Sequence, residues 1–66
     1  MIIYYSRHAR EQMIFRGISE KEIREAIQSG AKEIQNGKIV ANYRYFAVVY
    51  RVMEKDKYFI ITIKPE

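Results

Sequence analysis

The hydrophobic pattern of this chain changes its period once, near Ala31, and the change limits the folds that the sequence can adopt. Before it, apolar side chains recur three and four residues apart, as they do on one face of an α-helix. After it, apolar and polar side chains alternate, as in a strand with one buried face. We therefore expect an α+β domain in which two N-terminal helices pack on one face of an antiparallel sheet of three to four strands.

The length and composition of the chain allow one small domain, spanning residues 1–66. A chain of this size buries only about 60% of its unfolded surface and cannot form two cores. It contains no cysteine, and a lone His8 cannot provide a structural zinc site. No apolar run approaches the roughly 20 residues of a membrane span, and Met1–Tyr5 is too short for the apolar part of a signal peptide. We expect a cytoplasmic protein that requires no metal or other cofactor.

Serine and glycine residues set the bounds of the predicted helices. Ser6 is suited to cap a first helix that ends at Gly17. A second helix begins after Ser19, which forms a capping box with Glu22, and ends at Gly30. At 100° per residue, one face of the first helix carries His8, Ala9, Gln12, Met13 and Arg16.

The second half of the chain begins with a hairpin signal. Asn36 and Gly37 are the preferred dipeptide of a type I′ turn, and they lie between the segments AKEIQ and KIVAN. The run Lys38–Met53 is too long for one ordinary strand, so we expect a bend or bulge near Asn42. The apolar segment Met1–Tyr5 is predicted to be a short leading strand or an extended arm.

A second hairpin is predicted around the polar segment EKDK, which precedes YFIITIKP. Its register pairs Met53 with Tyr58, Arg51 with Ile60, and Val49 with Thr62. The face suited to the helices then carries Phe46, Val48, Tyr50, Val52, Phe59, Ile61 and Ile63. The open face carries Ala47, Val49, Arg51, Met53, Tyr58, Ile60, Thr62 and Lys64. Because no further element remains to cover this second apolar surface, we expect a protein partner, a second copy of the chain or a substrate to cover it.

The chain is basic, with 12 Lys+Arg against 8 Asp+Glu and a formal net charge of +4. This balance attracts polyanions or an acidic protein, although it is also compatible with solubility alone. Arg7, His8 and Arg10 lie in the first turn of the first helix, where positive charge opposes the helix dipole. These side chains either hold an anion together with the free amides or are solvated and offset by Glu11.

Two residues of the first helix are candidates for chemistry. Imidazole is the side chain whose ordinary pKa suits proton transfer near neutral pH. His8 is therefore a candidate general acid or base, or else it packs its ring against the sheet. Arg16 shares its face and either binds a phosphate or pairs with an acid such as Glu22.

The tyrosines of the chain have two possible roles. Six tyrosines with interleaved arginines resemble the composition of surfaces that bind single-stranded nucleic acid. Tyrosine is also a common strand residue, so the same residues can be structural. The candidate RNA-binding residues are Arg7, Arg10, Arg44, Arg51, Tyr43 and Tyr58.

The segment SRHAREQMIFRGISEKEIREAI, followed by FAVVYRV and FIITI, resembles the small prokaryotic domain-of-unknown-function family 4258. The family pattern S-x-H-A-x-x-x-M-x-x-R-x-I-S and its later strands fall on Ser6, His8, Ala9, Met13, Arg16, Ile18, Ser19, Val49, Tyr50 and Thr62. The resemblance covers nearly the whole chain. Members of this family look like relatives of RelE/ParE and BrnT toxins, which include metal-independent ribonucleases neutralised by a cognate antitoxin.

The resemblance implies a RelE-like, RNA-directed toxin of a toxin-antitoxin type system, without the extra C-terminal helix because the chain ends at Glu66. The implied activity is a metal-independent endoribonuclease that uses the RNA 2′-hydroxyl as nucleophile. His8 would be the general acid or base, Arg16 and Arg51 would stabilise the phosphorane, and Tyr50 or Thr62 would position the phosphate.

The expected partners are RNA, including ribosome-associated RNA, and an antitoxin protein or a second copy bound through the open sheet face. One alternative is a non-catalytic module whose open face binds a protein partner or a second copy of itself. Another is backbone-level binding of RNA without cleavage.

Overall fold

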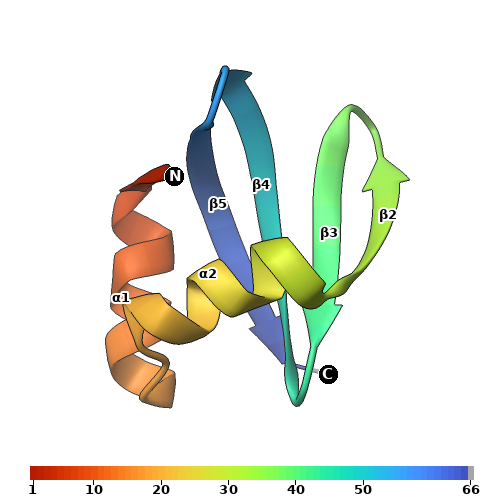
Figure 1. The fold of residues 1–66 in the computed structure, drawn as a ribbon. Coiled ribbons are helices and arrows are strands. Elements are labelled where there is room, and N and C mark those ends of the chain that lie inside the picture. Colours follow the sequence, from red (N-terminus) through yellow and green to blue (C-terminus); the bar gives the residue numbers. More distant parts are fainter. Residues whose placement is uncertain (66) are drawn as a thin grey trace.

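Two helices lie against a five-stranded sheet in the computed structural model, which describes residues 1–65 (Figure 1). The elements in chain order are β1 (Ile2–Tyr5), α1 (Arg7–Arg16), α2 (Glu20–Ser29), β2 (Ala31–Gln35), β3 (Lys38–Tyr43), β4 (Phe46–Glu54) and β5 (Lys57–Pro65). Because β2 begins at Ala31, where the hydrophobic pattern changes, the predicted α+β class is confirmed. Within the described residues, neither helix is long and apolar enough to cross a membrane.

The sheet is mixed, with the strand order β1-β5-β4-β3-β2. β1 runs parallel to β5, and the other neighbouring strands are antiparallel. The prediction of three to four strands was therefore wrong in number, whereas the predicted antiparallel direction is correct for every pair except β1 with β5. The Asn36–Gly37 turn joins β2 to β3 as predicted. The parallel pair escaped prediction because Ile2 pairs with Lys57, near the other end of the chain.

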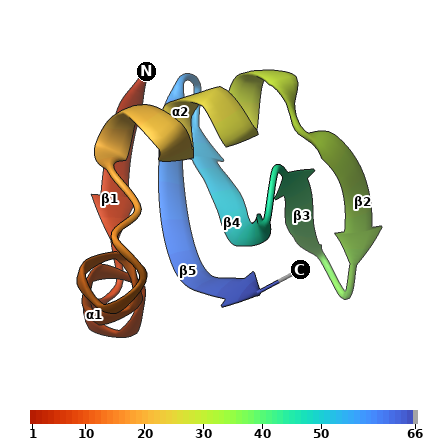
Figure 2. The same cartoon turned by 90° about the horizontal axis from the view of Figure 1, so that it is seen from below.

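The two helices occupy different places on the sheet (Figure 2). α2 crosses one face and packs against β3 and β4, whereas α1 lies at the border, against β5 and β1. The predicted packing of both helices on one face is matched only in part. α1 contributes Ala9 and Met13 to the core on that face, but most of its surface lies outside the core.

Local capping fixes both helix starts as the sequence predicted. The hydroxyl of Ser6 accepts a hydrogen bond from the Ala9 amide at 2.9 Å, and Gly17 ends α1 in the left-handed region with φ 68°. Ser19 and Glu22 form the predicted capping box of α2. The hydrogen bond from the Ser19 amide lowers the pKa of the Glu22 carboxyl below its ordinary value. These bonds satisfy amides that would otherwise lack partners at the helix starts.

Replacing Ser19 with alanine should lower the free energy of unfolding by about 1 kcal/mol, because the Glu22 amide loses the hydroxyl that accepts its hydrogen bond. Urea denaturation of both proteins measures the difference. Ser29→Ala is the matched control, since Ser29 is exposed at the opposite end of α2. An equal decrease in the free energy of unfolding for Ser19→Ala and Ser29→Ala would contradict a capping role for Ser19.

Gly30 ends α2 for a different reason from the one expected. Its φ is −69°, which is not the left-handed conformation of a typical C-terminal glycine. A Cβ at this position would lie 2.5 Å from the Ala26 carbonyl oxygen and 2.9 Å from that of Asn42. Glycine is therefore required because the end of the helix passes so close to β3.

The run Lys38–Met53 forms two strands rather than one bent strand. Arg44 and Tyr45 make a tight turn between β3 and β4. Arg44 has a φ of 54°, which is uncommon for residues other than glycine, asparagine and aspartate. The bend expected near Asn42 was therefore wrong in position and in kind.

The β4–β5 hairpin forms around EKDK as predicted, but its register shifts at two irregularities. The predicted pair of Val49 with Thr62 is confirmed, whereas Arg51 pairs with Phe59 and not with Ile60. Each additional residue in one strand moves the residues beyond it to the opposite face. No glycine or proline marks either irregularity in the sequence.

These shifts change the faces assigned to several side chains. Ile60 is fully buried in the core beneath the helices, with Tyr58 packed against that core, although both were assigned to the open face. Tyr58 pairs with Val52 rather than with Met53. Ile61, assigned to the helix face, packs against the open-face cluster instead. The helix-face assignment is confirmed for Phe46, Val48, Tyr50 and Ile63.

Candidate functional site

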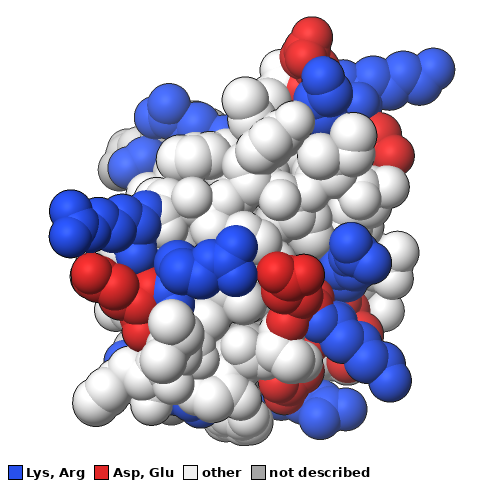
Figure 3. All heavy atoms as spheres, turned by 90° about the vertical axis from the view of Figure 1, so that its left-hand side faces the viewer, with Lys and Arg blue, Asp and Glu red and all other residues white. Residues whose placement is uncertain are grey.

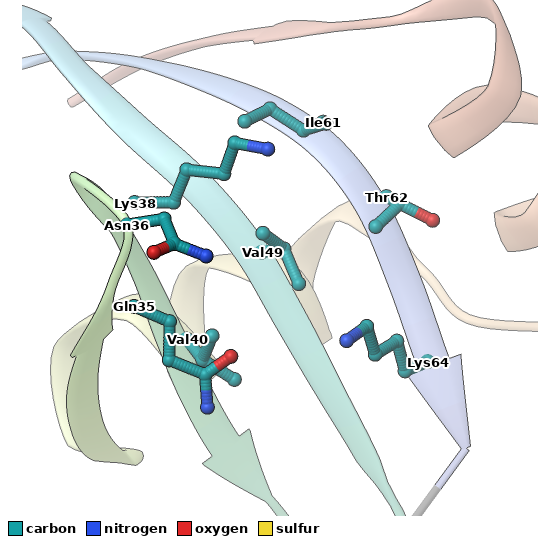
Figure 4. Close-up of a pocket in the computed structure, with 8 residues that line it drawn as sticks. All are labelled: Gln35, Asn36, Lys38, Val40, Val49, Ile61, Thr62 and Lys64. Carbon is teal, nitrogen blue, oxygen red and sulfur yellow. The ribbon is translucent and has the colours of Figure 1, made fainter.

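The sheet face opposite the main core carries a pocket of about 220 Å³ (Figure 4). Its floor consists of the aliphatic side chains of Val40, Val49 and Ile61, from β3, β4 and β5. Its polar rim consists of Gln35, Asn36, Lys38, Thr62 and Lys64. Figure 4 shows Lys38 and Lys64 reaching toward this floor from the strands on either side of β4. The pocket therefore combines an apolar floor with two cationic groups.

The apolar patch on this face is smaller than the sequence predicted. Val40, Ala47 and Val49 are only 7%, 3% and 6% exposed, although neither helix crosses them. Long rim side chains account for this burial, because their aliphatic stems lie along the apolar surface while their polar ends remain in water. The predicted patch also included Tyr58 and Ile60, which belong to the other face.

The charge at the pocket is predominantly positive. Among residues 1–65, none of the side chains that line it is acidic. Glu33 lies on the same face because it pairs with Val40, but its carboxylate accepts hydrogen bonds from Gln35 at 3.1 Å and Asn42 at 3.2 Å. Lys38 and Lys64 form no ion pair within the described chain. Such a site favours an anionic ligand.

Helix α1 borders this face along β5. β1 pairs with β5 only as far as Ile60, and α1 supplies the hydrogen bonds beyond that point. The Ser6 hydroxyl donates to the Ile61 carbonyl at 2.6 Å. The Gln12 side-chain oxygen accepts hydrogen bonds from the Ile63 amide at 2.9 Å and the Thr62 hydroxyl at 3.1 Å. Gln12 thus connects α1 directly to the rim of the pocket.

Gln12, Lys38 and Lys64 were not predicted as site residues. One signal for Gln12 was available, because it shares a face with the buried Ala9 and Met13. An amide on such a face needs a hydrogen-bond partner. The two lysines gave no comparable signal, since their placement at one pocket depends on the register of three strands.

His8 lies one helical turn before Gln12 and therefore on the same flank of α1. Its side chain is exposed, so the structure does not pack the ring against the sheet. Gln12 on this flank contacts Thr62, but His8 itself is not among the residues that line the pocket. Arg16 is also exposed but lies two turns further on, at the C-terminal end of α1.

Arg7 and Arg10 form ion pairs on the surface of the helices. Arg7 lies 3.7 Å from Glu11, and Arg10 lies 3.4 Å from Glu20. The guanidinium of Arg10 also stacks over the ring of Tyr5 at 4.5 Å. Figure 3, which looks onto the α1 side, shows acidic side chains among the basic ones. This side is therefore not a uniformly basic surface.

Arg44 and Tyr43 lie at the β3–β4 turn, beside α2. The hydroxyl of Tyr43 donates to Glu25 at 3.2 Å, and Arg44 lies over the Tyr43 ring at 5.4 Å. Tyr45 donates to Glu22 at 3.5 Å. These two acids belong to α2, on the face opposite the pocket, so the structure does not bring this arginine to the pocket.

Tyr50 and Tyr58 belong to the main core, with their ring centroids 5.8 Å apart. Tyr50 is only 2% exposed, and its burial raises the pKa of its phenol. Thr62 lies on the other face, so the structure does not bring Tyr50 and Thr62 together in one cleft. Arg51 is exposed on β4, two residues beyond Val49 and therefore on the pocket face.

Comparisons with known proteins agree with this fold. The model of the family described as "Domain of unknown function (DUF4258)" matches residues 5–64. Comparison with curated proteins gives no match. A chain in the crystal structure of the toxin-antitoxin complex RelBE2 from Mycobacterium tuberculosis has a similar fold, with a TM-score of 0.66 and 15% sequence identity. The alignment covers 98% of this chain and 96% of that chain. At this identity the similarity establishes the fold alone, and it confirms the RelE-like architecture predicted from the sequence.

Proposed function

The chain belongs to the DUF4258 family, and from this premise and its RelBE2-like fold we propose that it is a toxin-like protein that acts on RNA through the open face of the sheet. The observation that carries the proposal is the pair of lysines, Lys38 and Lys64, that reach over the apolar floor from either side of β4. Ammonium groups bind the phosphates that dominate affinity for nucleic acids. The side chain of Ile61, which is only partly buried, offers a surface against which a base or ribose can pack.

The proposed reaction is metal-independent cleavage of RNA. The 2′-hydroxyl oxygen attacks the adjacent phosphorus, and the bond from phosphorus to the 5′-oxygen breaks. The products are a 2′,3′-cyclic phosphate and a free 5′-hydroxyl, so the proton lost from the nucleophile is balanced by one gained by the leaving oxygen. We assign one of these transfers to His8, because it lies on the flank of α1 that leads to the pocket.

Charge stabilisation is assigned to one arginine on the pocket face and one on α1. Arg51 extends from β4 on the pocket side, and Arg16 lies two turns beyond His8 on α1. Their guanidiniums would offset the negative charge of the phosphorane. The proposal does not include Tyr50, since a side chain that is 2% exposed cannot contact a substrate without a rearrangement of the core.

A second candidate function is protein binding, which the outer surface of α1 favours. Ile14 is 76% exposed and Phe15 is 85% exposed, so two large apolar side chains stand in water on one short helix. The similar solved chain belongs to a toxin-antitoxin complex. An antitoxin-like protein is therefore the partner that we propose for this surface, and the two functions are compatible.

The proposed RNA site can be tested through the salt dependence of binding. We expect Lys38→Gln and Lys64→Gln each to weaken binding of a single-stranded RNA oligonucleotide. Each should also reduce the slope of log affinity against log salt by about 0.7 to 1. Fluorescence anisotropy at several salt concentrations measures both quantities.

The matched control is Lys55→Gln, because Lys55 is an exposed lysine in the β4–β5 turn, outside the pocket. It should leave the slope nearly unchanged. Equal reductions for all three variants would indicate non-specific attraction by net charge, and would count against the open face as the binding site.

A further inference from the structure

The backbone of β5 fixes the orientation of the Gln12 amide. The Gln12 oxygen lies 2.9 Å from the amide nitrogen of Ile63. A backbone N–H group can only donate, so the side-chain atom that faces it must be the carbonyl oxygen rather than the NH₂ group. The assignment therefore follows from chemistry, although oxygen and nitrogen have similar shapes in an amide.

This orientation determines where the hydroxyl proton of Thr62 points. The same Gln12 oxygen lies 3.1 Å from the Thr62 hydroxyl oxygen. Two oxygens at this distance attract each other only when a proton lies between them, and a carboxamide oxygen carries none. Thr62 must therefore donate its single proton to Gln12, and it offers only lone pairs to a ligand.

An oxygen that can only accept is unsuited to a phosphate, whose oxygens are also acceptors. The lysines nearby suit phosphate, and Lys64 lies two residues beyond Thr62 on the same strand. A ligand that satisfies both features carries phosphate oxygens and, close to them, a hydrogen-bond donor. The 2′-hydroxyl is such a donor, and it is the group by which RNA differs from DNA in its sugar.

We propose that Thr62 accepts a hydrogen bond from a ribose 2′-hydroxyl, and that Gln12 is the positioning residue that keeps the threonine hydroxyl in this acceptor state. Figure 4 shows the Thr62 oxygen pointing away from Val49, at the border of the pocket rather than over its floor. DNA has no 2′-hydroxyl and cannot make this hydrogen bond, so the site distinguishes RNA from DNA. This inference rests on the proposed function, and it replaces the phosphate-positioning role that the family resemblance implied for Thr62.

The test compares four single-stranded oligonucleotides of one sequence: RNA, DNA, 2′-O-methyl RNA and 2′-fluoro RNA. The last two carry a 2′ substituent but have no 2′ donor. We expect the wild-type protein to bind RNA about 3- to 10-fold more tightly than each of the other three, which corresponds to one hydrogen bond. Fluorescence anisotropy gives the affinities, measured with His8→Ala added to each protein because this change should slow cleavage while leaving binding nearly intact. A gel verifies that the RNA is intact.

Variants of Thr62 separate recognition from folding. Thr62→Val has nearly the same shape but no hydroxyl, so it should lose the preference for RNA while its affinity for DNA is unchanged. Thr62→Ser keeps a hydroxyl and should retain the preference. Circular dichroism verifies that both variants are folded.

Variants of Gln12 test its positioning role. Gln12→Glu keeps an acceptor oxygen for Thr62 and Ile63, so the preference for RNA should be retained. Gln12→Met has a similar length but only a weak acceptor, so the Thr62 hydroxyl is free to rotate between donating and accepting, and the preference should be reduced. If Gln12→Met does not fold, the comparison of Thr62→Val with Thr62→Ser still decides the role of Thr62.

Three results would overturn the inference. Equal binding of all four oligonucleotides by the wild type would show that the site reads no 2′ donor, while leaving the proposed RNA site intact. A preference for RNA that persists in Thr62→Val would assign it to another group. Failure to bind any of the four would remove the proposed function and this inference together.

Discussion

Replacing His8 with alanine should lower RNA cleavage by on the order of 10²-fold or more, while leaving RNA binding nearly intact. The expected loss is large because a positioned general acid or base acts in the transition state and contributes little to ground-state binding. His8 is exposed on α1, so its replacement should not disturb the core. Cleavage of free and ribosome-bound RNA, measured with a chelator present, gives the rate for each protein.

Arg16→Ala provides a contrasting variant, because a phosphate contact acts in both binding and cleavage and should weaken both. Its α-carbon lies about 12 Å beyond that of His8 along the helix axis, a span that suits a bound nucleotide. Lys21→Ala, an exposed position on α2, is the control for unspecific effects. Equal cleavage by wild type and His8→Ala would exclude His8 from the reaction. No cleavage by either protein would favour the protein-binding function.

The second large effect concerns stability. Gly30→Ala should lower the free energy of unfolding by about 1–3 kcal/mol or more, because the new Cβ would lie 2.5 Å from the Ala26 oxygen and 2.9 Å from the Asn42 oxygen. Both atoms belong to the backbone and cannot move alone. The entropic gain of about 0.4–1 kcal/mol that alanine brings at a compatible site is smaller. Since a domain of this size has only about 3–10 kcal/mol of stability, the loss is a substantial fraction.

Thermal and urea denaturation measure this loss, and the melting temperature should fall by about 4–8 °C for each kcal/mol. Gly17→Ala is the informative control, because a Cβ there meets nothing within 4 Å but the backbone has a φ of +68°. Gly17→Ala should lower the free energy of unfolding by about 1–2 kcal/mol, because alanine is strained in this left-handed backbone conformation. A Gly30→Ala protein as stable as the wild type would show that the end of α2 can move away from β3.

The helices could be predicted because their signals are local. The capping residues Ser6 and Ser19 each contact an amide three residues away, and Gly17 requires only a left-handed backbone. Such interactions depend on a few neighbouring residues and on no distant part of the chain. Their bounds were therefore visible in the sequence.

The strands were harder to predict because several of their determinants are distant or unmarked. Arg44 forms a tight turn without glycine or asparagine, and this hid the boundary between β3 and β4. The two irregularities of the β4–β5 hairpin carry no sequence signal, so Ile60 and Ile61 were assigned to the wrong faces. A single extra residue was enough to exchange an exposed position for a buried one.

The candidate site was predictable only in part, for the same reason. The sequence predicted roles for Thr62 and His8, which stay predictions; Thr62 lines the pocket, whereas His8 is exposed on α1 and is not part of the lining. It did not identify Lys38 or Lys64, because their placement at one pocket follows from the order of the strands. Gln12 was assigned to the correct face of its helix without a role.

The parallel pairing of β1 with β5 has a consequence for the order of folding. The turns from β2 to β5 join residues that are near neighbours in the chain, as in the pair of Tyr43 with Phe46. By contrast, the bond between Ser6 and Ile61 closes a loop across a separation of 55 residues. Loop closure costs entropy that grows with length, so we expect the four-stranded meander to assemble first and the N-terminal segment to dock last. A chain at the intermediate stage would already have Lys38 and Lys64 on one face of the sheet, but it would lack the helix that orients Thr62. The capacity to attract a polyanion would thus arise earlier in folding than the capacity to select among polyanions.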